Sequence, residues 1–104
     1  MLYIIYQIDK PGAEAVRAAN REAHFKYLDD HADILVLGGA LLGDDGATRT
    51  GSVLIVNVPS KADADRFSEN EPFRKAGLFS RVEVNRMRRG QWNPAVAPKT
   101  AEGN

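Results

Sequence analysis

Hydrophobic and polar positions along the chain divide it into two kinds of segment. Four runs are rich in β-branched, aliphatic and aromatic residues: residues 2–8, 34–42, 52–58 and 78–87. This composition predicts four β-strands. Segments 13–30 and 61–69 lack Pro and Gly and are rich in Ala and charged residues, which favours two helices. The predicted order is β-α-β-β-α-β, the ferredoxin-like α+β arrangement, with both helices on one face of a four-stranded antiparallel sheet.

Short-range signals predict where the second helix begins and ends. Ser60 precedes the helix and Asp63 lies in its first turn, so we expect Ser60 to be the N-cap. Glu71 precedes Pro72, and a residue before proline avoids helical geometry, so this helix ends there. Pro72 can open a short helical turn, which Gly77 closes.

The first helix carries the most informative polar residue. At roughly 100° per residue, Val16, Ala19, Ala23 and Tyr27 form one stripe, which we expect to face the core. His24 lies beside that stripe, and its imidazole can gain and release protons near neutral pH, as a general acid/base must. The alternative is a histidine at the edge of the core that only binds a backbone carbonyl.

Glu71 is the candidate carboxylate partner for His24. Its position before Pro72 holds the backbone extended and so limits the direction of its side chain. A carboxylate next to an imidazole fixes the tautomer of the ring. The alternative is that Asn70 and Glu71 only cap the short turn that Pro72 opens.

The predicted strands are apolar on both of their faces. Segments 34–37 and 53–56 show no alternation of apolar and polar residues, whereas a solvated sheet face alternates. Two helices cover only one face, and the other would expose an apolar patch larger than monomers usually carry. We therefore expect a homodimer that stacks through the open sheet faces.

Charge and cysteine content exclude several classes of function. Fourteen Lys and Arg residues balance fourteen Asp and Glu residues, which argues against nucleic acid as a partner. Without cysteine there is no disulfide, thiolate metal site or cysteine nucleophile. No apolar run approaches the roughly 20 residues that span a bilayer, and the N-terminus does not resemble a signal peptide. We expect a cytoplasmic protein with no membrane partner.

A metal site is not expected. His31 lies among Asp29, Asp30 and Asp33, but no second histidine lies at a spacing that would complete a ligand set. Acidic residues at a helix end usually face solvent, and we expect an exposed His31 among them.

The C-terminal end has a different composition from the rest. Three arginines follow one another closely at the end of the last strand: Arg86, Arg88 and Arg89. They either bind an anionic ligand or keep an edge strand soluble. Residues 93–104 are rich in Pro, Ala and Gly, so we divide the chain into a domain, 1–89, and a mostly irregular tail, 90–104.

Several blocks resemble the YciI-like, or YCII-related, domain family over about residues 1–88. They are Met1 to Tyr6, His24, Gly38-Gly39-Ala40, Thr50-Gly51-Ser52 and Asn70 to Phe79. The resemblance implies a ferredoxin-like fold, a dimer, and a shared histidine and aspartate for which members are viewed as probable enzymes. By this resemblance the histidine is His24, and the aspartate position holds Glu71, which is longer by one methylene.

Two functions remain open. The first is a lyase or isomerase that works by proton transfer without metal or organic cofactor. His24 would be its general acid/base and Glu71 its orienting group, in a pocket between the first helix and the sheet. The second is a non-catalytic dimeric module that binds a small ligand, which the change from aspartate to Glu71 slightly favours. A solvent-shielded contact of about 3.2 Å or less between the two side chains would favour the enzyme.

Overall fold

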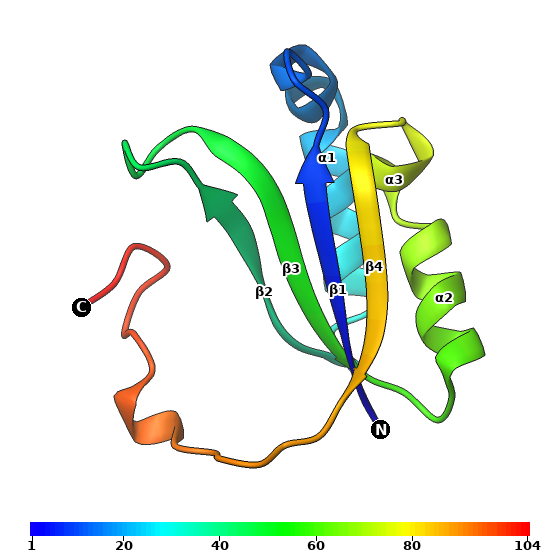
Figure 1. Ribbon diagram of the computed structural model, residues 1–104, viewed down its shortest axis with the longest axis vertical. Coiled ribbons are helices and arrows are strands. Elements are labelled where there is room, and N and C mark those ends of the chain that lie inside the picture. The colour runs from blue at the N-terminus through cyan, green and yellow to red at the C-terminus, as the bar shows by residue number, and fades with distance from the viewer.

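The computed structural model describes residues 1–104 and contains one four-stranded sheet (Figure 1). Strand β1 (Leu2–Asp9) pairs with β3 (Arg49–Asn57) on one side and with β4 (Phe79–Met87) on the other, and β2 (Leu35–Leu42) pairs with the outer side of β3. All pairs are antiparallel, and the order is β2-β3-β1-β4. The predicted ferredoxin-like α+β fold is confirmed.

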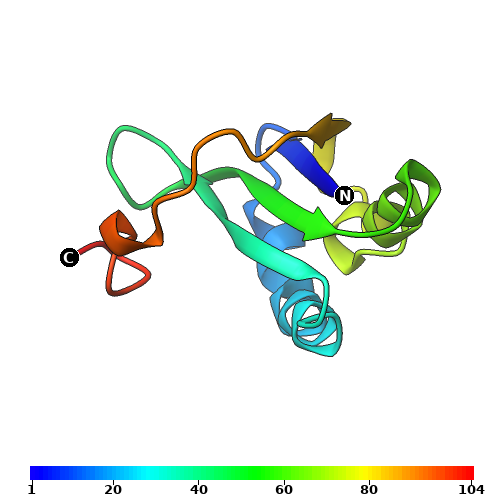
Figure 2. The same ribbon diagram turned by 90° about the horizontal axis from the view of Figure 1, so that it is seen from below.

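Three helices lie on one side of this sheet: α1 (Glu14–Asp30), α2 (Lys61–Glu69) and the short α3 (Pro72–Lys75) (Figure 2). The predicted ends of α2 and α3 are confirmed, because the Ser60 side chain accepts a hydrogen bond from the Asp63 amide and Gly77 has a φ of 76°. None of the helices combines the length and apolar character needed to cross a membrane.

The main core lies between the sheet and the helices. Seven buried residues of β1, β3, the β3–α2 connection and α2 form it: Tyr3, Ile5, Leu54, Val56, Val58, Ala64 and Phe67. Val82 and Val84 of β4 and Tyr27 of α1 pack against its margin. Helix α1 therefore contributes little to this cluster, and its buried face serves other contacts.

The buried face of α1 differs from the predicted one. Ala19 and Ala23 are exposed, and the two buried residues of the helix are Arg17 and His24. Both lie roughly 80° to 100° from Val16 around the helix axis. Alanine gains little from burial, whereas Arg17 and His24 find charged partners in other elements, so these contacts decide which face turns inward.

The sheet face away from the helices is apolar on three strands. Ile4 and Tyr6 of β1 lie opposite Ile55 and Val53 of β3 on this face, and Leu37 of β2 continues the patch with 63% of its surface exposed. We propose that a second copy of the chain covers this face, because one chain leaves these side chains partly open to water.

This proposal predicts a particle of twice the 11.4 kDa chain mass in light scattering at micromolar concentration. Replacing Leu37 with Asp places a charge in the apolar patch, so we expect monomers. The matched control is Phe25→Asp, which adds the same charge at an exposed position of α1 and leaves the dimer intact. A monomeric wild-type chain would remove the stacking argument.

The C-terminal tail leaves β4 and passes beside the β2 edge without joining the sheet (Figure 1). It contains one 3₁₀ turn (Pro94–Val96) and a bridge between Thr100 and Gly103, and its side chains are exposed. Trp92 is 60% exposed in this chain, with the Arg89 guanidinium 5.7 Å from its ring centre.

Candidate active site

The structure brings His24 and Glu71 together although 47 positions separate them in the sequence. The Nδ1 atom of His24, on α1, makes a short hydrogen bond with Oε1 of Glu71, which stands directly before α3. The Glu71 side chain is completely buried and the His24 side chain is 9% exposed. This is the solvent-shielded contact whose presence favours an enzyme over a binding module.

The backbone of α3 orients the Glu71 carboxylate. Its second oxygen, Oε2, accepts hydrogen bonds from the amides of Phe73 (3.1 Å) and Arg74 (3.3 Å). Glu71 is thus the N-cap of α3, with Pro72 at the first helical position. The sequence left two roles open for Glu71, as the partner of His24 or as the cap of the turn that Pro72 opens. The side chain makes both contacts, because Oε1 contacts His24 while Oε2 accepts from the α3 amides.

In His24, the second imidazole nitrogen is not used by the contact with Glu71. The His24 ring stacks on Phe73, with 3.9 Å between ring centres and an angle of 14°. Its Nε2 atom has no partner in the chain and is not sealed from solvent. With Nδ1–H donated to Glu71, the neutral ring presents Nε2 as a proton acceptor.

The Tyr27 hydroxyl, one turn further along α1, has a raised pKa. Burial raises the pKa of its hydroxyl, and the negative charge of Glu71 raises it further. The hydroxyl donates to the Phe67 carbonyl at 2.8 Å. Because a negative charge opposes ionisation of the phenol, Tyr27 stays neutral beside the pair.

The second histidine is placed differently from the prediction. His31 is half-buried rather than exposed, with Nδ1 donating 2.7 Å to the Tyr27 carbonyl and its ring 4.2 Å from that of Tyr27. The three neighbouring aspartates do not join it, and no group of three or more His, Asp or Glu side chains is arranged to hold a metal ion.

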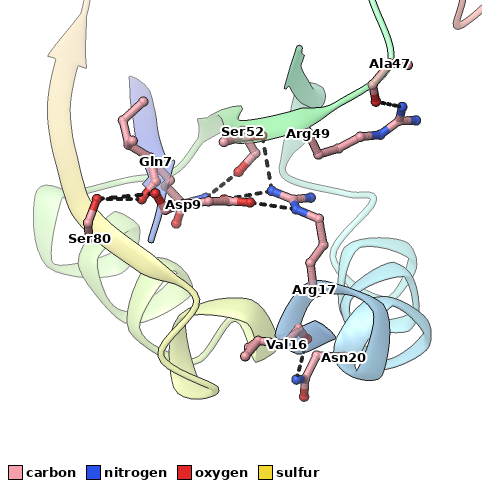
Figure 3. A network of polar contacts seen from close by, with 11 residues as sticks. Gln7, Asp9, Val16, Arg17, Asn20, Ala47, Arg49, Ser52 and Ser80 are labelled. Atoms are coloured by element: carbon pink, nitrogen blue, oxygen red, sulfur yellow. Dashed lines mark hydrogen bonds and ion pairs between the residues drawn. The ribbon is translucent and has the colours of Figure 1, made fainter. Parts of the chain in front are cut away.

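An ion pair that the sequence analysis did not predict lies two helical turns from His24, and both of its side chains are 11% exposed. Arg17 of α1 donates from Nε and one terminal nitrogen to the two carboxylate oxygens of Asp9, both at 2.9 Å (Figure 3). It also donates to the Gly51 carbonyl at 3.2 Å, and its guanidinium lies 4.8 Å from the ring centre of Phe73. The spacing of Arg17 and His24, seven residues on one helix face, was the available signal.

A second missed contact joins the two central strands behind this ion pair. Gln7 Nε2 donates 2.8 Å to the Ser52 hydroxyl, and both residues are buried (Figure 3). The Gln7 Oε1 atom has no partner. The available sequence signal was a glutamine in a strand otherwise rich in Ile and Tyr, where a polar side chain needs a partner if it faces the interior.

Two cavities flank the His24–Glu71 pair along α1. One of about 360 Å³ lies between the end of α1 and α2, and its lining includes Tyr27, His31 and Asn70. The other, of about 260 Å³, lies where the start of α1 meets the ends of β1 and the β2–β3 loop. Neither lining includes His24 or Glu71, so neither cavity is the pocket that we expect around this pair between the first helix and the sheet.

Comparison with known proteins agrees with the resemblance seen in the sequence. The family model described as the YCII-related domain matches residues 1–88. Proteins named YciI from Escherichia coli and Shigella flexneri are each 32% identical over 91 residues, covering 81% of this chain and 93% of theirs. The structure of 5-chloro-2-hydroxyhydroquinone dehydrochlorinase (TftG) from Burkholderia phenoliruptrix AC1100, in complex with 2,5-dihydroxybenzoquinone, is 40% identical with a TM-score of 0.82, covering 86% of this chain and 96% of that one.

Proposed function

The chain belongs to the YCII-related domain family, and from this premise we propose that it is a cofactor-independent lyase that eliminates an acid such as HCl from a hydroxylated ring. His24 transfers the protons and Glu71 orients its imidazole. The single observation that carries this proposal is the buried His24–Glu71 hydrogen bond, which leaves Nε2 as the free proton acceptor.

The similar dehydrochlorinase supports the substrate class. Its name specifies loss of HCl from a chlorinated trihydroxybenzene, and it was solved with a dihydroxylated quinone. Such a ring carries acidic hydroxyl protons next to the carbon that loses its substituent. An imidazole that accepts a hydroxyl proton and returns it to carbon matches this chemistry.

The elimination balances without an oxidant. Nε2 of His24 accepts a hydroxyl proton and returns it to the chlorine-bearing carbon, which becomes tetrahedral. A second hydroxyl proton then passes to Nε2, the oxygen forms a carbonyl, and chloride leaves with the electron pair of the carbon–chlorine bond. The products are a hydroxyquinone, chloride and a proton, so the ring loses HCl.

Glu71 is a positioning residue in this scheme. Its Oε1 atom holds Nδ1–H and stabilises the imidazolium that forms when Nε2 is protonated. Glutamate is one methylene longer than the aspartate that the resemblance implies at this position. The α3 amides of Phe73 and Arg74 fix its far oxygen, which limits the directions that the longer side chain can take.

The test is an anaerobic assay with 5-chloro-2-hydroxyhydroquinone, which prevents oxidation of the substrate by air. We expect the protein to release one chloride for each hydroxyquinone formed, well above the rate in buffer. If 2,5-dihydroxybenzoquinone binds but no chloride is released from the chlorinated compound, the protein is the small-ligand binding module that the sequence left open.

A further inference from the structure

The 260 Å³ cavity at the start of α1 concentrates positive charge on a chain whose net charge is zero. Four cationic side chains line it: Lys10, Arg17, Arg21 and Arg49. Two carboxylates, Asp9 and Glu14, face it as well, which leaves an excess of two positive charges. We propose that this cavity is an anion-binding site that anchors an ionised oxygen of the ligand.

Three of these cations are free to bind a ligand. The Asp9 carboxylate is fully engaged by Arg17, so it does not neutralise the others. Lys10 and Arg21 have no side-chain partner, and Arg49 gives only one guanidinium nitrogen to the Ala47 carbonyl, 2.8 Å away (Figure 3). Guanidinium groups with unused N–H donors are suited to carboxylate-like and phenolate oxygens.

The helix geometry connects this cavity with the candidate catalytic histidine. Arg17, Arg21 and His24 follow the spacing i, i+4, i+7, so their side chains leave α1 on one face. Phe73 bridges two of them, since it contacts the Arg17 guanidinium and stacks on the His24 ring. A ring anchored by its ionised oxygen in the cavity therefore lies on the same face of α1 as His24.

The ligand class follows from the charge of the cavity, and this step rests on the proposed function. A hydroxyquinone is a vinylogous carboxylic acid, in which the negative charge of the ionised form is shared between two oxygens. At neutral pH 2,5-dihydroxybenzoquinone is therefore an anion, and each ionised oxygen lies next to a carbonyl oxygen on the neighbouring ring carbon, so that the two together can accept guanidinium N–H groups. The site selects ionised hydroxyquinones over their neutral ethers.

The experiment compares two probes by titration at neutral pH and low salt: 2,5-dihydroxybenzoquinone and its neutral dimethyl ether. We expect the anion to bind the wild-type protein more tightly, and the double variant R21A/R49A to weaken its binding by about tenfold or more. Added salt weakens binding of the anion. The ether binds weakly to both proteins.

The matched control removes two positive charges elsewhere. Arg88 and Arg89 are exposed and directly follow β4, so R88A/R89A lowers the net charge equally and leaves the affinity for the anion within about twofold. The proposal is overturned if the wild-type protein does not bind the anion, or if the two double variants bind it equally. Chloride release distinguishes a failure of this site from a failure of the proposed function. If the anion binds through Arg21 and Arg49 but no chloride is released, only the proposed function is overturned. If chloride is released and R21A/R49A binds the anion as tightly as the wild-type protein, only the site is overturned.

Discussion

Replacing His24 with Gln lowers kcat/KM for chloride release by about 10²- to 10⁴-fold, the usual contribution of a general acid/base. The glutamine amide can still donate a hydrogen bond to Glu71 Oε1, which is completely buried in the native protein. It offers no basic nitrogen in place of Nε2, so the proton acceptor is lost while the contact with Glu71 is kept. Steady-state chloride release measures the loss, and circular dichroism verifies the fold of the variant.

The chain supplies its own control for this substitution. His31 is the second of its two histidines, and its Nδ1 donates to the Tyr27 carbonyl rather than to a carboxylate. His31→Gln is expected to retain wild-type kcat/KM within about twofold. Binding of 2,5-dihydroxybenzoquinone stays within a few-fold in both variants, because neither changes the cationic cavity. Chloride release by His24→Gln within tenfold of wild type would contradict the role assigned to this residue.

Replacing Glu71 with Ala lowers the free energy of unfolding by about 3–5 kcal/mol, the loss expected when a buried carboxylate is removed and its hydrogen-bond partners are left unsatisfied. The substitution leaves His24 Nδ1 and the amides of Phe73 and Arg74 without their acceptor. It also opens a space in a site where the native side chain is completely buried. Such a loss is a large part of the stability of a domain this size, and urea denaturation followed by circular dichroism measures it.

Two further variants separate the parts of this effect. Glu71→Gln keeps an oxygen for the α3 amides and loses the charge, so we expect a smaller loss, about 1–3 kcal/mol. Glu69→Ala removes a carboxylate from the exposed end of α2, where it has no hydrogen-bond partner, and changes stability by no more than about 0.5 kcal/mol. A Glu71→Ala variant as stable as Glu69→Ala would show that the buried contacts contribute nothing to folding.

The elements and most of their boundaries could be predicted because they depend on near neighbours in the chain. Ser60, Pro72 and Gly77 act on the backbone within a few positions, and their effects are the same in any fold. The third strand begins at Arg49, three residues before the predicted start. Pairing of Gly51 and Arg49 with β2 extends it, and residue preference alone does not show this.

The orientation of α1 could not be predicted from its apolar positions. Val16, Ala19, Ala23 and Tyr27 form the most apolar stripe, yet the helix buries Arg17 and His24. Short alanine side chains give only a weak preference for one face. Partners that come from β1 and from the start of α3 decide the outcome, and a helical wheel contains neither.

Local signals predicted the β-α-β-β-α-β order and drew attention to His24 and Glu71, because strand composition, helix caps and proline geometry act over a few neighbouring residues. Packing of the elements against one another gives the rest: these two side chains share a hydrogen bond, Asp9 pairs with Arg17, and a cationic cavity lies at the start of α1. Each of these contacts joins side chains from different elements. Their proximity depends on how helices and strands pack, which residue preferences along the chain do not specify.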